Sequence, residues 1–315
     1  MPANTVSIII PTWNGKHLLA ECLDALRKQT LQPTETIVVD NGSTDGSVDF
    51  LAERYPEVRT VALPINKLFA GGVNEGIRHS TSSIVVLLNN DATVEPDWLA
   101  ELIGALERHP EAGMAASKLL LYDRPGFFHS AGDFYGVDGV PGNRGVWEED
   151  RGQYDVEELV FSPCAAAAAY RKEMLDAIGL LDEDLGAYCE DVDLAFRAQL
   201  AGYQCVYVPS ARVRHRLSAT GGGPFASYYC GRNFMHVATK NMPLPILQKY
   251  WWRILTSQLR YLTESLVHIR EASARARIRG QWAGLRSLPQ AWAKRRSIQA
   301  LQSVPTAYIE AILRA

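Results

Sequence analysis

Short apolar runs alternate with segments of helical spacing along the first third of the chain. The runs that predict buried strands are residues 6–10, 36–39, 58–62 and 84–88. The intervening segments repeat apolar side chains every three or four positions, which predicts helices at residues 16–28, 47–54 and about 72–79. Uninterrupted apolar runs separated by helices are typical of a parallel sheet covered on both faces. The pattern therefore predicts an α/β fold with a Rossmann-like, mostly parallel sheet flanked by helices.

The pattern is different in the rest of the chain. Residues from about 122 to 160 are rich in Gly, Asp and aromatic side chains, which predicts loops or short antiparallel strands. Helices are predicted at 172–178 and 191–201, followed by a strand at 205–208. From about residue 245 the chain consists of long helical segments with many arginines. We therefore expect an α/β domain at residues 1–240 and a basic, amphipathic helical C-terminal extension at residues 241–315.

Two carboxylates stand at the ends of predicted strands. Because ligands of parallel sheets bind beyond the carboxyl ends of the strands, Asp40 and Asp91 are expected at one site. Asp40, with the Gly-Ser-Thr loop after it, is suited to bind the base or ribose of a nucleotide, although a helix-capping turn has the same composition. Asp91 is suited to share Mg²⁺ or Mn²⁺ with a nucleotide diphosphate, because such hard cations take carboxylate and phosphate oxygens. An Asx turn that ends the strand is the alternative.

A third acidic group, Glu190-Asp191-Val192-Asp193, opens a predicted helix. One of these carboxylates is suited to act as a general base that accepts a proton from an attacking hydroxyl. Acidic residues also favour first helical turns for electrostatic reasons alone. Helical spacing places Glu190, Asp193 and Arg197 near one face and Asp191 on another, so we expect Asp191 to have a separate role.

A single histidine, His215, lies between two arginines and ahead of three glycines at 221–223. An isolated histidine is more often a surface or core residue than a ligand. Here the arginines and the glycines are typical of a mobile loop that folds over a diphosphate. His215 is suited to complete the shell of a metal ion, while Arg214 or Arg216 pairs with phosphate oxygens.

These motifs occur along the chain in a characteristic order. The ordered segments are Ser7–Asn14, Val39–Gly46, Asn66–Asn74, Leu88–Asp91, Leu181–Glu183 and Glu190–Leu194. In this order the chain resembles family 2 glycosyltransferases of the GT-A fold, and most of all their rhamnosyltransferase-type and galactofuranosyltransferase-type members. The resemblance covers residues from about 5 to 240.

The resemblance implies a role for each motif. Asp40 matches the carboxylate that binds the nucleoside, and Thr12 and Asn14 line the same pocket. Asp91 matches the last residue of the metal-binding Asp-x-Asp motif, and Asp191 matches the catalytic base. His215 matches a histidine that some members use as a metal ligand. Together the motifs give this predicted set of substrate-binding residues: Thr12, Asn14, Asp40, Asn41, Asn74, Asn90, Glu190, Arg214 and Arg216.

The chain departs from the family pattern at three positions. Asn89 replaces the first Asp of the metal motif, which leaves one carboxylate and favours a contribution from His215. Leu68 stands where a Gly is usual, and Ala165 occupies a stretch where a Gly often precedes the small residues. Contacts to the donor or the acceptor are therefore expected to differ in these two places.

The activity implied is inverting, metal-dependent transfer of rhamnose or another hexose from a UDP- or dTDP-linked sugar to an acceptor hydroxyl. The acceptor is expected to be a glycan or a polyprenyl-linked precursor of cell-wall or surface polysaccharide. A nucleotidyltransferase is the second reading, but residues 11–14 are not the Gly-rich, basic phosphate loop that it needs. An inactive module that binds a nucleotide or a glycan is the third, and the intact Asp40, Asp91 and Asp191 argue against it.

Charge is unevenly distributed along the chain. The formal net charge is -3, but eleven basic and two acidic residues fall between positions 249 and 296, with four tryptophans among them. Basic helices with Trp and Leu on one face suit an anionic membrane surface; packing on the α/β domain is the alternative, and no nucleic-acid motif accompanies the charge. No segment approaches the roughly 20 apolar residues of a membrane span, and five scattered cysteines indicate a reducing compartment. We therefore expect a cytoplasmic protein, peripheral on the inner face of the cell membrane.

Overall fold

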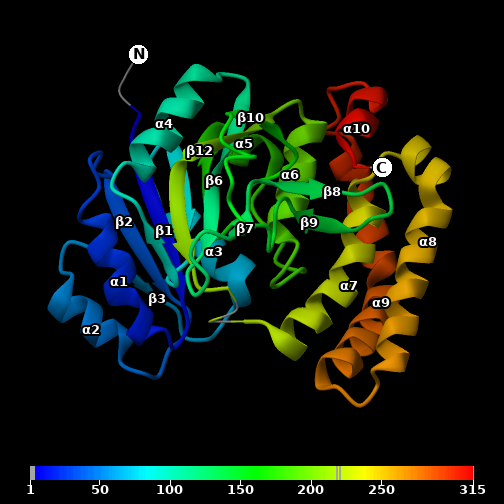
Figure 1. The fold of residues 1–315 in the computed structure, drawn as a ribbon, viewed down its shortest axis with the longest axis horizontal. Helices are drawn as coiled ribbons and strands as arrows, with labels where there is room; N and C mark the ends of the chain where they lie inside the picture. Colours follow the sequence, from blue (N-terminus) through cyan, green and yellow to red (C-terminus); the bar gives the residue numbers. More distant parts are fainter. Residues whose placement is uncertain (1–3, 218, 220, 315) are drawn as a thin grey trace.

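A mixed β-sheet forms the centre of the molecule, and the computed structural model describes it within residues 4–217, 219 and 221–314 (Figure 1). The sheet order is β10-β12-β6-β11-β4-β1-β2-β3, with β5 paired to β12 and β7 to β6. The parallel strands of the first third are β1 (Val6–Thr12), β2 (Glu35–Asp40), β3 (Arg59–Ala62) and β4 (Ile84–Leu88). The helices between them are α1 (Lys16–Leu26), α2 (Ser47–Arg54) and α3 (Leu68–His79). The predicted α/β class is confirmed.

One antiparallel strand joins the two halves of the sheet. It is β11 (Ala167–Arg171), which lies between β4 and β6 (Ala112–Leu121) and runs opposite to both. Beyond β6 the sheet continues with β12 (Gln204–His215), parallel to β6. The short strands are β5 (Ala92–Val94), β7 (Phe128–Ser130), β8 (Asp133–Tyr135), β9 (Pro141–Asn143) and β10 (Glu158–Val160). Four of them fall in the segment for which loops or short antiparallel strands are predicted.

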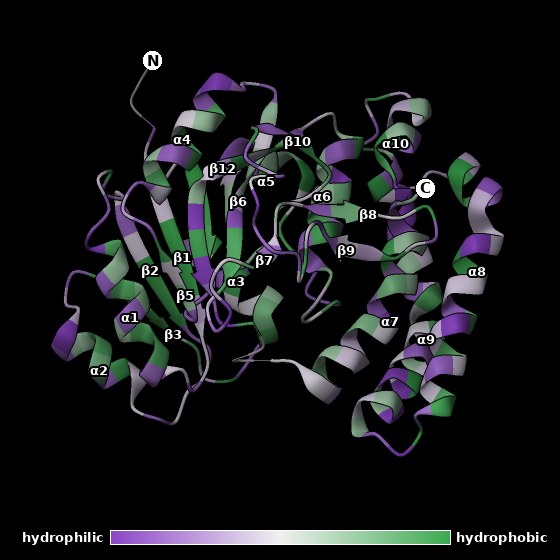
Figure 2. Ribbon diagram, viewed as in Figure 1, coloured by the Kyte–Doolittle hydropathy of each residue, from purple (hydrophilic) through white to green (hydrophobic). Residues whose placement is uncertain are grey.

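Hydrophobic cores cover both faces of the sheet, which explains the uninterrupted apolar runs. Ile8 and Ile10 face one core with helices α1 and α4 (Trp98–Arg108), whereas Ile9 between them faces the other. The second core includes side chains of α3, α5 (Lys172–Ile178) and α6 (Glu190–Leu200). Figure 2 shows the apolar colour concentrated along the central strands.

Two predicted boundaries are wrong. Strand β12 does not end at residue 208 but continues to His215, because buried Ala211, Val213 and His215 alternate there with exposed residues. A search for uninterrupted apolar runs does not detect such a half-buried strand. Helix α3 begins at Leu68 rather than near Gly72, since the side chain of Asn41 binds the chain that leads into it, with hydrogen bonds at 2.8 Å to the Lys67 N–H and the Leu68 carbonyl.

The C-terminal extension is helical, as predicted, with α8 (Leu244–Val267), α9 (Ala272–Gln299) and α10 (Thr306–Ile312). A further helix that was not predicted, α7 (Gly223–Asn241), precedes it. Helix α9 packs closely along α7, since a Cβ added at Gly280 would lie 2.1 Å from the carbonyl oxygen of Tyr228. Helix α8 lies on the outside of α9 (Figure 1). In the described part of the chain no helix is both long and apolar enough to cross a membrane.

A buried ion network ties this helical extension to α6. Lys240 of α7 is 1% exposed and contacts the carboxylates of Asp182 and Asp193, the latter at 2.8 Å. Lys294 of α9 reaches Asp182 at 2.6 Å. The two lysines hold the pKa of Asp182 well below its usual range, against the effect of burial. Asp193 also pairs with Arg197 at 3.2 Å, as the predicted face of α6 requires.

We predict that Lys240→Ala destabilises the fold by about 3 kcal/mol, because it removes the buried cation that Asp182 and Asp193 share and leaves them only Lys294 and Arg197. Urea unfolding followed by circular dichroism measures the change. The matched control is Lys249→Ala, which removes the solvent-exposed pair with Glu310 and should leave the transition midpoint unchanged. Equal midpoints for the two variants would contradict a structural role for the Lys240 network.

Candidate active site

One large cavity of about 940 Å³ opens at the carboxyl ends of the parallel strands. It reaches from the end of β1 across the Asn89–Asp91 turn to the first turns of α6 and α7. Four carboxyl-bearing residues line it, together with two histidines: Asp91, Asp133, Glu190, Asp191, His129 and His215. Among the described residues that line the cavity there is no lysine or arginine. The cavity therefore concentrates carboxyl groups without a cationic side chain among its described lining residues to balance those that ionise.

Asp91 and His215 meet in this cavity because strand pairing brings them together. His215 ends β12 and lies opposite Ala92 of β5, which follows Asp91 directly. The distance from His215 Nε2 to Asp91 Oδ1 is 3.1 Å, and both side chains are buried. Asp91 Oδ1 accepts no hydrogen bond from the residues that the structure describes. A buried, unsatisfied carboxylate oxygen beside an imidazole nitrogen is a pair of donor atoms of the kind that divalent metal ions take.

His129 supports His215 and was not predicted. The two imidazole rings stack with centroids 4.9 Å apart, and their Nδ1 atoms are 3.1 Å apart. Burial lowers the pKa of His129 to about 3, with a further contribution from the charge of His215. His129 is therefore neutral, and its Nδ1 can accept a proton that His215 Nδ1 donates. In that tautomer the Nε2 lone pair of His215 faces Asp91, as metal binding requires.

The asparagines beside Asp91 also lie in the cavity. The side chain of Asn90 donates to the Thr12 hydroxyl at 2.8 Å, which joins the ends of β1 and β4. The Nδ2 atom of Asn89 lies 3.4 Å from His215 Nε2, and the buried Oδ1 atom of Asn89 has no partner among the described residues. Asn89, which stands in place of the usual Asp, thus lies beside His215 with its amide nitrogen toward the imidazole.

Asp40 lies next to the cavity rather than in its lining. It ends β2, opposite Thr12, and is 2% exposed. One carboxylate oxygen accepts the N–H of Ser43 at 3.1 Å, and the other, also buried, has no partner in the described chain. Asn14 lies outside the lining as well, and its side-chain oxygen accepts the N–H of Thr44 at 2.8 Å. The two acidic strand ends share one edge of the sheet, as predicted, and the nucleoside role of Asp40 stays a prediction.

Three predicted substrate-binding residues are directed elsewhere. Asn74 is buried, and its side chain binds both the N–H and the carbonyl of Leu181, at 3.1 and 2.9 Å. Arg214 alternates with the buried His215, points outward and pairs with Glu95 at 3.0 Å.

Arg216 also lies outside the lining, where it pairs with Glu21 at 2.8 Å and covers the ring of Tyr122. A strand that alternates its faces cannot point His215 and both neighbouring arginines into one cavity. The loop expected to fold over a diphosphate includes positions 218 and 220, which lie outside the described residues.

Asp191 projects into the cavity from the first turn of α6. Its carboxylate accepts the backbone N–H of Ala165 at 3.1 Å and that of Val192 at 2.8 Å. Burial raises the pKa of Asp191 above its ordinary value in spite of these two donors. Glu190 lines the cavity beside it, where burial and the charge of Asp191 raise its pKa as well. Glu190 thus shares the cavity with Asp191 instead of lying apart from it with Asp193, as the helical spacing had suggested.

The turn before α6 is strained and held from α7. Tyr188 and Cys189 have φ angles of 64° and 69°, in the left-handed region that side chains disfavour. The buried amide of Asn233 donates to the carbonyl oxygens of Leu185, Ala187 and Tyr188 at 2.7–3.0 Å. The C-terminal helices therefore fix the backbone that presents Asp191.

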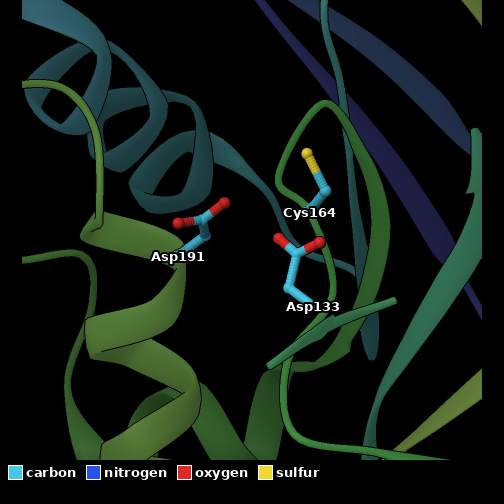
Figure 3. A group of neighbouring side chains, drawn as sticks. All are labelled: Asp133, Cys164 and Asp191. Carbon is cyan, nitrogen blue, oxygen red and sulfur yellow. The ribbon is translucent and has the colours of Figure 1, made fainter. Parts of the chain in front are cut away.

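Two further residues beside Asp191 were also missed. Asp133, at the start of β8, and Cys164, in the loop before β11, lie with Asp191 so that one ligand atom of each is within 4.8 Å of the others (Figure 3). Neither residue stands in a predicted element or in a family motif. The one signal in the sequence for Asp133, and likewise for His129, is polarity, since both interrupt an otherwise apolar and small-residue stretch.

Residues 7–179, more than half of the chain, match the family model described as "Glycosyl transferase family 2". The chain belongs to this family. The α/β sheet with its carboxyl-edge cavity is a GT-A fold with a C-terminal helical extension.

Its relatives include rhamnosyltransferases. The N-acetylglucosaminyl-diphospho-decaprenol L-rhamnosyltransferase of Mycobacterium tuberculosis is 26% identical over 273 residues, which cover 79% of this glycosyltransferase and 87% of the relative. A Sinorhizobium fredii protein, y4gI, is 32% identical over 232 residues, or 69% of this chain. The match spans only 25% of the length of y4gI.

Among solved structures, the mannosyltransferase PcManGT from Pyrobaculum calidifontis, in complex with GDP-Man and Mn²⁺, has a similar fold. The TM-score is 0.55 at 22% identity, and the superposition covers 98% of this glycosyltransferase and 79% of PcManGT. At that coverage the shared fold extends from the sheet into the C-terminal helices.

Proposed function

We propose that this glycosyltransferase moves a sugar from a nucleoside-diphosphate sugar to an acceptor hydroxyl, with metal assistance and with inversion at the anomeric carbon. The observation that carries the proposal is the cavity in which Asp91 with His215 and, separately, Asp191 face one space without any lining lysine or arginine in the described chain. The first pair suits the leaving diphosphate, and Asp191 suits the attacking hydroxyl.

The charge of the cavity supports metal dependence. A diphosphate brought next to four carboxyl groups needs a cation, and Arg214 and Arg216 point elsewhere. Asp91 and His215 would hold Mg²⁺ or Mn²⁺, because a buried carboxylate oxygen and an imidazole nitrogen 3.1 Å apart can both serve as ligands to one divalent ion. When bound, the ion neutralises charge on the departing nucleoside diphosphate. PcManGT, whose fold is similar, was solved with Mn²⁺.

Asp191 would act as the general base. Its raised pKa makes it a stronger proton acceptor than an exposed aspartate, and its two N–H donors fix the carboxylate in place. It would take the proton of the acceptor hydroxyl as the oxygen attacks the anomeric carbon from the side opposite the diphosphate. Such an in-line attack inverts the anomeric configuration and forms no covalent enzyme intermediate.

The donor would place its nucleoside at the end of β2. Asp40 has a buried oxygen there without a partner among the described residues, and this oxygen is suited to accept an N–H of a pyrimidine base or a ribose hydroxyl. Thr12, Asn14 and Asn41 form the surrounding loops. UDP- or dTDP-linked rhamnose, or another hexose, fits the relationship to rhamnosyltransferases.

The Asp191→Asn variant tests the catalytic assignment. We expect transfer to fall at least about 100-fold, because the amide cannot accept the proton, while the affinity for the nucleotide-sugar with Mn²⁺ changes little. Product formation and donor binding by calorimetry measure the two effects. Asp176→Asn, on the exposed side of α5, is the matched control. Residual activity of Asp191→Asn within tenfold of the parent would remove Asp191 as the base.

The outer surface of α8 and α9 supports an acceptor carried by a membrane. Large apolar side chains there are 48–60% exposed: Trp251, Trp252, Leu255, Leu259, Leu266, Trp282, Leu285 and Trp292. Arginines stand between them, so apolar and charged residues alternate along the outermost helix (Figure 2). Amphipathic rings among basic residues are suited to the interface of an anionic bilayer. We therefore extend the proposal to peripheral attachment of the protein to an anionic membrane. In this arrangement the exposed surface of α8 and α9 contacts the bilayer, while α9 packs on α7.

A second cavity, of about 500 Å³, lies between the β8–β9 hairpin and α8. Arg253, Arg260 and Arg314 line it together with Trp252. Pro141 of the hairpin lines this cavity and the larger one, so the two adjoin. An acceptor linked to a polyprenyl diphosphate would meet guanidinium groups here, between the membrane side of α8 and the catalytic carboxylates. The Mycobacterium tuberculosis relative is named for such an acceptor.

Vesicle flotation tests the attachment. The protein should float with phosphatidylglycerol vesicles at low ionic strength, bind less as salt increases, and bind weakly to phosphatidylcholine. Replacing Trp252, Leu255 and Leu259 together by Glu should reduce binding at least tenfold. Val156→Glu, an exposed apolar position away from α8 and α9, is the control. A full-length protein that stays unbound to the anionic vesicles at low salt would contradict the membrane role.

A further inference from the structure

Asp133 is a buried carboxyl group in the wall of the cavity for which the reaction proposed above has no use. It begins β8 and is 5% exposed. The Ser130 hydroxyl and the Asn143 amide both donate to the same oxygen, Oδ1, at 2.6 and 2.8 Å. These bonds fix the direction of the carboxyl group and leave the second oxygen, Oδ2, for another partner.

The carboxyl group of Asp133 lies close to that of Asp191, the proposed base. Asp133, Asp191 and Cys164 each place one ligand atom within 4.8 Å of the others (Figure 3). The titratable groups nearest to Asp133 are the carboxyl group of Asp191 from α6 and the thiol of Cys164 from the loop before β11, and Glu190 lines the same cavity. No lysine or arginine occurs among the described lining residues. Two neighbouring carboxylates without a cation do not both ionise readily near neutral pH.

The protonation states follow from the surroundings of each carboxyl group. Two backbone N–H groups stabilise the anion of Asp191. For Asp133, burial raises the pKa to about 8, helped by the negative charge of Asp191 and opposed by the two hydrogen bonds to Oδ1. At pH 7 the pair is therefore one carboxylate, Asp191, beside one neutral acid, Asp133. A neutral acid can both donate and accept a hydrogen bond through Oδ2.

We propose that Asp133 forms the second half of the acceptor site and binds the hydroxyl next to the one that Asp191 deprotonates, so that the acceptor is a sugar with two adjacent hydroxyls. The inference rests on the proposed function, in which Asp191 is the base. Neighbouring hydroxyl oxygens of a sugar ring are roughly 3 Å apart, about one hydrogen-bond length. Two carboxyl groups as close as Asp133 and Asp191 can engage both. One hydroxyl then reacts, and the other sets which hydroxyl is presented to Asp191.

A cycle of enzyme variants and acceptor analogues tests the role. The acceptors are an N-acetylglucosaminyl-diphospho-lipid and analogues that each lack one ring hydroxyl. Asp133→Ala should lower kcat/KM for the intact acceptor on the order of 10- to 100-fold, because a hydroxyl loses its partner. For the analogue without that hydroxyl the loss should shrink to about threefold or less. Asp133→Asn, which still donates and accepts, should recover part of the activity, and Asp176→Ala is the control for folding and handling.

An equal loss for every analogue would overturn the proposal, since Asp133 would then act through structure alone. Wild-type turnover of the intact acceptor is measured first and tests the proposed function separately. If the wild type transfers to none of these acceptors, the pH dependence of nucleotide-sugar hydrolysis decides, with water in the acceptor position. The wild-type rate should fall above about pH 8, where Asp133 ionises beside Asp191, and Asp133→Asn should remove this fall. Identical alkaline limbs in the two enzymes would contradict the proposal.

Discussion

Negative charge without a cationic side chain is the constraint on which the site depends. Asp91, Asp133, Glu190 and Asp191 line one cavity, and no lysine or arginine in the described lining balances them. Burial of ionised carboxylates raises the free energy of the folded state, and each group reduces this penalty in a different way. His215 lies beside Asp91, backbone N–H groups stabilise the anion of Asp191, and Asp133 keeps its proton. The same imbalance would favour a diphosphate that binds together with a divalent cation over a bare diphosphate. The proposed metal ion, the proposed base and the neutral acid thus share one electrostatic origin.

The fold supplies this arrangement through connections that are distant in sequence. Parallel β1, β2 and β4 bring Asp40 and Asp91 to one edge, and the pairing of β12 with β5 delivers His215 to Asp91. The C-terminal helices complete the site rather than merely follow it. Asn233 of α7 holds the strained turn before Asp191, and Lys240 secures α6 from behind. Helix α7 thus contacts both the turn that precedes Asp191, the proposed base, and helix α9, whose exposed surface carries apolar and basic side chains.

Much of this could be predicted from the sequence, because strand ends and helix starts are local signals. The apolar runs placed Asp40 and Asp91, and the motif order placed Asp191 and His215. Asp133 could not be found in this way, since its position comes from short strands whose pairing with distant segments has no periodicity. His129 was missed for the same reason. Arg214 was assigned to phosphate because its strand was expected to end early, and alternation along the full strand turns it outward. Asn74 lies in a family motif, yet its side chain binds Leu181.

The most direct measurement of the central claim is calorimetric titration of UDP and dTDP into the wild-type protein with Mn²⁺ and with EDTA, and into Asp91→Ala with Mn²⁺. If the diphosphate needs a cation that Asp91 holds, the wild type binds at least one nucleotide with Mn²⁺. The affinity then falls at least about tenfold with EDTA, and Asp91→Ala shows a similar loss. Equal affinity in all three titrations would show that the diphosphate needs no cation in this cavity and would contradict the account.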